Sequence, residues 1–443
     1  MMMKNILFCV FLFYTVLSFA QSKKEMVYAI ALKQNNYIET NQFDSVTKCF
    51  SPFLKNQLST EKLAETWKLL PYQFGKFDSI EKTDVDTLPG FYTTTTLFKF
   101  RHTKIALFIS FDNDLKISVF DFRKNYQYIP PVIVNTLKFT EHKIFFGKAP
   151  YIITGMLTIP NDIKNPPCVI IIGSSGPNDM DMTYGDNKMY KDLAWELACK
   201  GIAVFRYDKR TFNLGSQILT DKYAGKQLTL KEEYLDDAKF AIEYILNSGK
   251  VDSKNIFLIG HDQGGMMAPL IAKQNKKIAG VIMMAANARP TQDVMTDQID
   301  FLINEPDYNS VQKSFYIKTK QLAVKSKNPK LKPSEPEDSM PGATASYWIS
   351  VNNYHQIEIA KNLNQPIYVL QGERDYHVGL KDFEIWKNEL SERNRTFKLY
   401  PKLNHHFMEG EGAISSKEYD KRNHVPDYVA DDIAGWIKEV SMK

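Results

Sequence analysis

The sequence is poor in cysteine and has no strong excess of charge of either sign. Four cysteines occur among 443 residues, without the spacing of a zinc site or a disulfide framework. The formal net charge of +5 is too small for the basic surface typical of nucleic-acid-binding proteins. We therefore expect no structural metal, no cofactor and no nucleic-acid partner, and we predict that Cys168 and Cys199 are small buried hydrophobic residues.

Long apolar runs are also absent beyond the N-terminus. There, one lysine precedes an apolar stretch over residues 6–16, and Ser18, Phe19 and Ala20 end it with small residues. This layout is typical of a secretory signal peptide cleaved after Ala20, and the stretch is shorter than the roughly 20 residues that span a bilayer. The sequence thus predicts a signal peptide over residues 1–20, a secreted or periplasmic protein, and no integral membrane segment after cleavage.

The remaining chain changes its pattern once. Residues 22–130 indicate a small α+β domain, in which helical segments precede strands such as "KIALFISF" and "ISVFDF" around the turn "FDNDLK". From residue 145 to 443 apolar strand-like runs alternate with helical patterns, starting with "PPCVIIIGSSGP". Such alternation predicts an α/β domain with a mostly parallel sheet flanked by helices.

One segment interrupts this alternation. Residues 290–350 lie between two predicted strands and are far longer than an ordinary connection. Helical spacing of Met295, Ile299 and Leu302 predicts a helical cap inserted into the domain, and the lysine- and proline-rich run from residue 318 to 342 is expected to be an exposed loop.

The stretch "NIFLIGHDQGG" carries the first candidate for chemistry. A predicted strand ends at Gly260, one polar residue stands on a tight turn, and Gly264 and Gly265 open a helix, which is the pattern of a nucleophile elbow. Asp262 occupies the position that usually carries serine. At a helix N-terminus, where negative charge is favoured, the Gln263 N–H is one candidate oxyanion donor, and Ser175 of the "GSSGP" loop supplies a second.

Two further residues complete the pattern. Asp375 follows the predicted strand "PIYVLQG", and His405 follows the predicted strand "TFKLYP". Nucleophile, acid and histidine occur in the chain order of the α/β-hydrolase fold. We therefore predict Asp262, Asp375 and His405 as the catalytic residues, acting on a small-molecule substrate.

On these motifs the chain resembles the α/β-hydrolase superfamily, and in particular the exported bacterial hydrolases that carry a small N-terminal domain and lie near dienelactone hydrolases, bile-acid-CoA acyltransferase-like proteins and carboxylesterases. The matching segments are Ser174–Pro177 with Asp179 and Asp181, Asp208–Thr211, Gly260–Gly265, Leu370–Asp375 and Leu403–His405. The resemblance implies an α/β-hydrolase fold and an ester or acyl hydrolase. The chain departs from the family pattern at Ser174, Met180, Thr211 and Asp262.

The aspartate leaves three functions open. Attack of a carboxylate on an ester carbonyl would form an anhydride, so simple replacement of serine by aspartate disfavours ester hydrolysis by the usual route. Attack on the saturated carbon of an epoxide or a carbon–halogen bond would instead leave an ordinary ester on Asp262, which His405 could hydrolyse. Tyr308, Tyr316, Tyr347 and Tyr354, in or near the insertion, are candidate partners for an epoxide oxygen. The third alternative is a binding protein that has lost catalysis.

Overall fold

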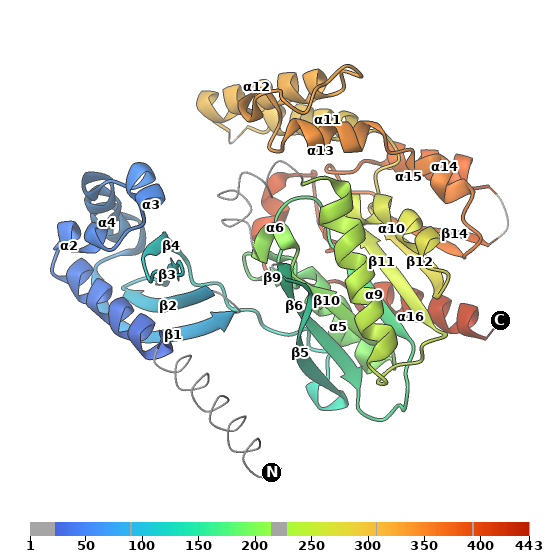
Figure 1. Cartoon of the computed structure of the whole chain (residues 1–443), viewed down its shortest axis with the longest axis horizontal. Coiled ribbons are helices and arrows are strands. Elements are labelled where there is room, and N and C mark those ends of the chain that lie inside the picture. The colour runs from blue at the N-terminus through green and yellow to red at the C-terminus, as the bar shows by residue number, and fades with distance from the viewer. Residues whose placement is uncertain are drawn as a thin grey trace, which may run out of the picture. The chain divides into compact units, whose positions relative to one another are not determined.

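The computed structural model describes residues 23–88, 91–149, 151–213, 228–306, 308–391 and 394–442. The predicted signal peptide lies outside these ranges. The chain divides into two compact units, Met1–Gln127 and Tyr128–Lys443 (Figure 1). Within the described ranges, no helix combines the length and the apolar character needed to cross a bilayer.

The first unit packs helices on one face of an antiparallel sheet. Residues 23–39 are helical, and α2 (Phe43–Lys48), α3 (Pro52–Gln57) and α4 (Thr60–Phe74) follow. The sheet has the order β1 (Phe77–Leu88), β2 (Phe91–Phe100), β3 (Lys104–Phe111) and β4 (Ile117–Lys124). Trp67 of α4 lies among Phe77, Phe98, Phe100 and Phe122, so this tryptophan holds helix and sheet together.

The second unit is built on a mostly parallel sheet of eight described strands. Their spatial order is β14 (Arg395–Tyr400), β13 (Ile367–Gly372), β12 (Ile278–Met284), β11 (Ile256–His261), β7 (Cys168–Ile172), β10 (Ala203–Tyr207), β6 (Tyr151–Pro160) and β5 (Phe139–Lys148). Only the β10–β6 and β6–β5 pairs are antiparallel. Every residue of β7, β10, β11 and β13 is buried, which explains why these strands read as unbroken apolar runs.

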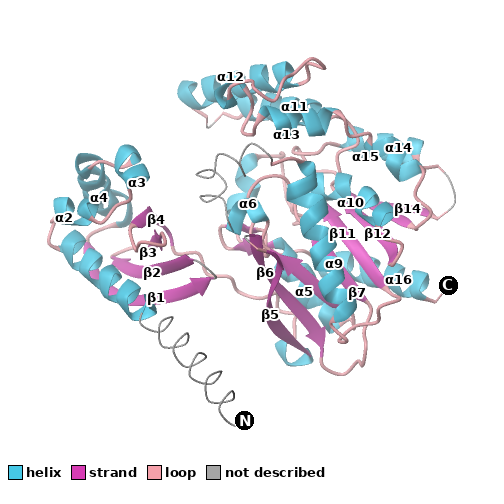
Figure 2. Cartoon of the chain, in the orientation of Figure 1, coloured by secondary structure: helices cyan, strands magenta, loops and turns pink. Residues whose placement is uncertain are grey.

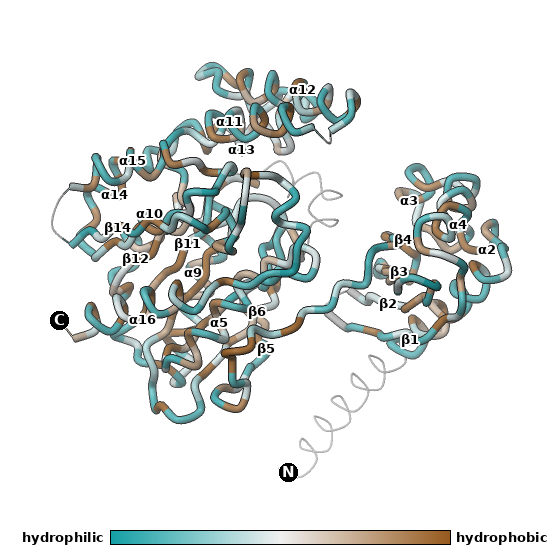
Figure 3. Tube along the Cα trace, turned by 180° about the vertical axis from the view of Figure 1, so that it is seen from behind, coloured by the Kyte–Doolittle hydropathy of each residue, from teal (hydrophilic) through white to brown (hydrophobic). Residues whose placement is uncertain are grey.

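Helices cover both faces of this sheet (Figure 2). The core on one face includes side chains of α5 (Met189–Cys199) and α16 (Asp427–Ser441). The core on the other face includes α9 (Asp237–Asn247), α10 (Gln263–Gln274) and α15 (Leu380–Glu389). In Figure 3 hydrophobic colouring concentrates on the strands, between these two helical layers. Shorter elements are the 3₁₀ turns at Thr136–Lys138 and Ser416–Asp420, β8 (Thr183–Tyr184), β9 (Asn187–Lys188), α6 (Arg210–Asn213) and the π-helical turn η2 (Lys231–Asp236).

A helical segment stands between β12 and β13, where the insertion was predicted. It consists of α11 (Thr291–Asn304), α12 (Ser310–Ser326), a 3₁₀ turn at Glu337–Ser339, α13 (Ala345–Asn352) and α14 (Gln356–Lys361). The expected loop from residue 318 is wrong in its first part, because α12 continues to Ser326. A capping box of Asn309 and Gln312 starts this helix, and lysines on its exposed face are compatible with it. Cys168 is buried as predicted, whereas Cys199 is only partly buried; both are free thiols.

Candidate active site

The elbow is a sharp turn between β11 and α10. Asp262 adopts φ 54° and ψ −120°, a conformation that costs a non-glycine residue about 1–3 kcal/mol. Its N–H donates to the Met284 carbonyl at 2.9 Å, and its own carbonyl accepts from the Met266 N–H at 3.0 Å. A Cβ on Gly264 would lie 2.3 Å from the Ile172 carbonyl oxygen, so only glycine lets α10 approach β7 this closely. The local sequence therefore forces the side chain of Asp262 out of the strand–helix turn.

Among the described residues, all hydrogen bonds donated to the Asp262 carboxylate go to one of its two oxygens. Its Oδ2 accepts from the Ser174 hydroxyl at 2.9 Å, the Ser175 N–H at 3.0 Å and the Ser175 hydroxyl at 2.6 Å. Both serines follow the end of β7, next to β11 in the sheet. The predicted donor Ser175 thus lies at the carboxylate, and Oδ1 is left without a hydrogen-bond donor among the described residues.

The surroundings of Asp262 favour its ionised form. Desolvation by burial raises its pKa, but the charge of His405 and the hydrogen bonds from Ser175 oppose this effect, and the pKa is lowered to about 2. Asp262 is thus an anion throughout the neutral pH range.

His405 and Asp375 lie together as their order in the chain suggested. The Nδ1 of His405 donates to Asp375 Oδ2 over 2.8 Å, and this bond directs Nε2 away from Asp375. The other oxygen of Asp375 accepts the N–H groups of His377 and Val378, both at 2.8 Å. Burial lowers the pKa of His405, but the charge and hydrogen bond of Asp375, followed by the charge of Asp262, raise it above its ordinary value of 6.5.

His261, immediately before the elbow, joins these two parts. Its Nε2 donates to the carbonyl of His405 at 2.9 Å, and its Nδ1 accepts from the Tyr190 hydroxyl at 3.0 Å. That hydroxyl in turn accepts the Ser174 N–H at 3.0 Å. Burial, followed by the charge of His405, lowers the pKa of His261 to about 3, so that it stays neutral and serves as a fixed spacer.

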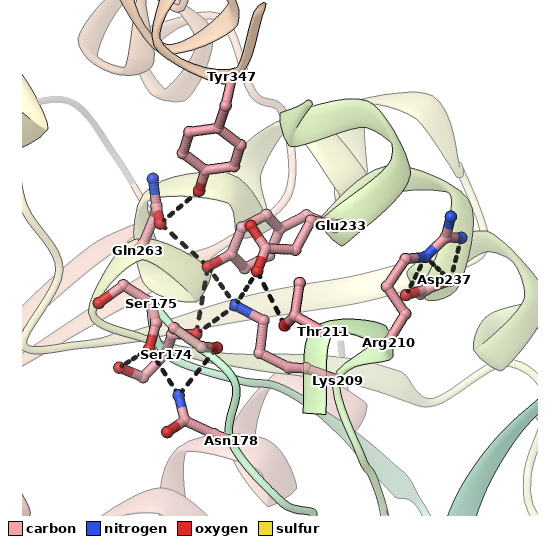
Figure 4. Close-up of polar contacts among 12 residues, drawn as sticks. Ser174, Ser175, Asn178, Lys209, Arg210, Thr211, Glu233, Asp237, Gln263 and Tyr347 are labelled. Carbon is pink, nitrogen blue, oxygen red and sulfur yellow. Dashed lines mark hydrogen bonds and ion pairs between the residues drawn. The ribbon is translucent and has the colours of Figure 1, made fainter. Parts of the chain in front are cut away.

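Gln263 directly follows Asp262, and its backbone N–H stays a predicted oxyanion donor. Its side-chain Oε1 accepts from the hydroxyl of Tyr234 at 3.1 Å and from that of Tyr347 at 3.0 Å (Figure 4). Its Nε2 is buried and has no hydrogen-bond partner among the residues that the structure describes.

The four candidate tyrosines of the insertion are spread over different places. Tyr347 of α13 reaches the elbow through Gln263, and its pKa is raised well above 10 by burial and by the charges of Glu233 and Asp262. Tyr354 donates to the Met266 carbonyl at 2.9 Å. The rings of Tyr308 and Tyr316 lie 5.5 Å apart and contact each other. Of these four, Tyr347 bonds the side chain of the residue after Asp262, and Tyr354 bonds the backbone of α10.

Several residues that complete the site were not singled out from the sequence. The Ser174 hydroxyl donates to Asp262. Lys209, Glu233 and Tyr234 form a buried group beside the loop of Ser174 and Ser175, called the serine loop below (Figure 4). The motif Asp208–Thr211 gave a signal for Lys209 but no role. In the ranges described here, no group of three or more His, Cys, Asp or Glu side chains is arranged to hold a metal ion.

Comparisons with known proteins show which superfamily the chain belongs to. Residues 31–120 match a family model described as a protein of unknown function, DUF3887, and residues 185–412 match the model "Serine aminopeptidase, S33". The chain is 33% identical over 404 residues to Esterase EstD of Thermotoga maritima, covering 90% of this chain and 93% of that protein. Among solved structures, Est1E from Butyrivibrio proteoclasticus has 15% identity and a TM-score of 0.44 and covers 68% of this chain and 99% of its own. The Pyrococcus furiosus esterase PF2001 has 13% identity and a TM-score of 0.43, with 71% and 97% covered. The family matches, the mostly parallel sheet and the elbow between β11 and α10 together show that the chain belongs to the α/β-hydrolase superfamily and is related to esterases.

Proposed function

We propose that this protein is a hydrolase that works through a covalent ester on Asp262. The observation that carries the proposal is the asymmetry of the carboxylate: Oδ2 holds three donors from Ser174 and Ser175, whereas Oδ1 holds none among the described residues. Oδ1 is therefore the oxygen available to attack an electrophilic carbon.

In the first step, Asp262 Oδ1 attacks a saturated carbon of the substrate. A carbon–oxygen bond forms to Asp262, and the bond from that carbon to an epoxide oxygen or a halogen breaks, with its electron pair leaving on the oxygen or halide. The pKa of about 2 ensures that the carboxylate needs no base to become a nucleophile.

In the second step, His405 and Asp375 hydrolyse this ester. His405 Nε2 takes a proton from water, and the resulting hydroxide attacks Cγ of Asp262. Negative charge then develops on Oδ2, which already accepts the Ser175 N–H at 3.0 Å. Collapse of this intermediate breaks the bond between Cγ and Oδ1, so Oδ1 leaves as the hydroxyl oxygen of the product with the proton from His405, and the oxygen from water takes its place in the Asp262 carboxylate. The protein thus uses ester-hydrolysing machinery on an ester made from its own side chain.

A second candidate function is hydrolysis of external carboxylic esters. The relation to Esterase EstD, which extends over 90% of the chain, favours it. Because Asp262 Oδ2 already holds the Ser175 N–H, an external carbonyl oxygen would have to displace it, and His405 would then activate water without a covalent intermediate.

The deciding experiment traps the covalent ester. His405→Gln removes the base for the second step, so the proposal predicts that incubation with an aryl epoxide or a bromoalkane adds the mass of the alkyl group to a peptide containing Asp262. Asp262→Asn in the same background is the matched control and should stay unmodified. The proposal is wrong if the unmutated protein turns over such a substrate while the His405→Gln protein accumulates no adduct. Turnover of p-nitrophenyl esters alone, lost in His405→Ala, would favour the second candidate, and absence of any turnover would favour a binding protein.

We also propose that the protein is exported, on the basis of residues 1–20. N-terminal sequencing of protein isolated from the native cell should begin at Gln21, and a mature chain that retains Met1 would contradict export with cleavage.

A further inference from the structure

A buried lysine stands behind the loop that bonds Asp262. Lys209, shortly after β10, is 3% exposed, and all three protons of its ammonium group have acceptors. It donates to the Ser174 carbonyl at 2.7 Å and to the Tyr234 hydroxyl at 2.8 Å, and it forms an ion pair with Glu233 Oε1 at 2.8 Å (Figure 4).

The first of these contacts lies one peptide group away from the candidate nucleophile. Because a trans peptide is planar, its C=O and N–H point in opposite directions. The peptide between Ser174 and Ser175 presents its oxygen to Lys209 and its N–H to Asp262 Oδ2, at 3.0 Å. A single rigid group therefore connects the lysine with the carboxylate.

We propose that Lys209 is a positioning residue that aims and polarises the Ser175 N–H toward Asp262. The ammonium group fixes the rotation of the Ser174–Ser175 peptide. Its charge also draws electron density toward the carbonyl oxygen, and polarisation along such a chain strengthens each hydrogen bond by about 10–30%. The inference about hydrolysis rests on the proposed function, in which this N–H meets the charge that develops on Oδ2.

The surrounding contacts connect Lys209 with both sides of the elbow. Tyr234 accepts the lysine proton, and its hydroxyl lies 3.2 Å from the Ser174 carbonyl and 3.1 Å from Gln263 Oε1. A buried ion pair generally adds little stability, and well-packed apolar residues can replace it at no cost. Stability alone therefore does not account for the Lys209–Glu233 pair, and the bond from Lys209 to the Ser174 carbonyl points to a role at the site.

The next residue along the chain offers a matched control. Arg210 is buried and forms an ion pair with Asp237 at 2.5 Å, and its side chain has no hydrogen bond to Ser174 or Ser175 in the described structure. Removing either pair disturbs a buried charge at the same turn, but only Lys209 bonds the serine peptide. Each pair is therefore removed whole, in Lys209→Met/Glu233→Gln and in Arg210→Met/Asp237→Asn, so that neither variant keeps an unpaired buried charge.

Hydrogen exchange of the Ser175 amide tests the positioning without any turnover. With serine labelled by ¹⁵N, the amide should exchange at least about tenfold faster in the Lys209 variant than in unmutated protein, and unchanged in the Arg210 variant, because the N–H no longer faces Asp262 squarely. Equal protection in the two variants would overturn the proposal, and this readout is independent of what the protein hydrolyses. If the Lys209→Met/Glu233→Gln protein does not fold, Lys209→Gln/Glu233→Gln, which also removes both charges, provides the same comparison.

Single-turnover kinetics test the second half of the inference. Loss of one oxyanion donor costs about 10²–10³-fold in rate, so hydrolysis of the Asp262 ester should slow by up to about 10²-fold in the Lys209 variant while its formation changes by less than about threefold. Equal slowing of both steps would reduce Lys209 to a structural residue. If the Ser175 amide loses protection in the Lys209 variant but no Asp262 ester forms in unmutated protein, Lys209 positions the N–H as proposed and only the proposed function is refuted.

Discussion

Ser175 bonds the same oxygen of Asp262 twice, from its backbone N–H at 3.0 Å and from its hydroxyl at 2.6 Å. The backbone donor is the one expected to meet the oxyanion of an ester substrate, so the carboxylate occupies the place where a substrate carbonyl would bind. Aspartate at position 262, where a nucleophile elbow usually carries serine, would thus differ from serine both as a nucleophile and in occupying this donor.

Asp262→Ser should release that donor and create an ester hydrolase. His405, held by Asp375 at 2.8 Å, would take the proton of the introduced serine, and the Ser175 N–H would be free for the substrate oxygen. We expect hydrolysis of p-nitrophenyl acetate to rise by about 10²-fold over unmutated protein, a small part of the roughly 10⁶-fold that a serine nucleophile contributes in serine hydrolases. Asp262→Ala is the control and should show no rise; equal rates in the two variants would mean that the remaining residues are not arranged for catalysis.

Ser175→Ala should make the covalent step sensitive to acid at a higher pH. Burial raises the pKa of Asp262, whereas the charge of His405 and the 2.6 Å hydrogen bond from the Ser175 hydroxyl lower it, to about 2. Loss of this hydrogen bond raises the pKa, and ester formation, which needs the anion, falls as the pH drops through it. The rate of adduct formation between pH 3 and pH 6 measures the shift. Ser248→Ala is the control, since its hydroxyl donates to the Ile245 carbonyl and accepts the Lys250 N–H, and it should leave the pH profile unchanged.

Asp375→Asn should slow hydrolysis of the ester and move its pH dependence. His405 must be neutral to accept a proton from water, so hydrolysis rises as the pH increases through its pKa, which Asp375 and Asp262 raise above 6.5 despite burial. An amide in place of Asp375 removes this charge, so the midpoint moves to lower pH. It also no longer selects the productive tautomer, and the maximal rate falls by about 10⁴-fold as for the analogous change in serine proteases.

A pH series of single-turnover rates for the second step checks both effects. Asp252→Asn, on the turn before β11, is the control for a lost carboxylate and should keep the midpoint and the rate. An unchanged midpoint in Asp375→Asn would show that the His405 pKa does not control hydrolysis.

The sequence was most informative where one short segment determines the geometry. The glycines around Asp262 and the apolar runs before it predict a strand, a tight turn and a helix, and the structure has these at β11 and α10. The positions of Asp375 and His405 followed from the rule that parallel strands end at one edge of a sheet. Whether these residues are catalytic remains a prediction.

Contacts between segments that are far apart in the sequence could not be predicted in the same way. Ser174 bonds Asp262 across 88 residues of sequence, and Tyr347 bonds Gln263 across 84. Such pairs depend on side-chain rotamers and on the position of α13 relative to α10. Neither the rotamers nor this position can be recognised from a local sequence pattern. A buried lysine such as Lys209 also looks like any surface lysine until its acceptors, Ser174 and Glu233, are placed around it.

Gly264→Ala should damage the site by separating α10 from β7. The added methyl group would lie 2.3 Å from the carbonyl oxygen of Ile172 and 2.4 Å from that of Gly173, and backbone atoms cannot move aside as a flexible side chain can. Overpacking of this kind costs about 1–3 kcal/mol of unfolding free energy. Because Ser174 and Ser175 directly follow Gly173, a shift of the helix also lengthens their bonds to Asp262. We therefore expect a lower unfolding midpoint in denaturant together with slower formation of the Asp262 ester.

Gly435→Ala is the matched control for Gly264→Ala, since no described atom lies within 4 Å of a Cβ there and the position is inside α16. It should stabilise the protein by about 0.5–1 kcal/mol and leave ester formation unchanged. A Gly264→Ala protein with normal stability and normal kinetics would show that close approach of α10 to β7 is not what holds Asp262 against the serine loop.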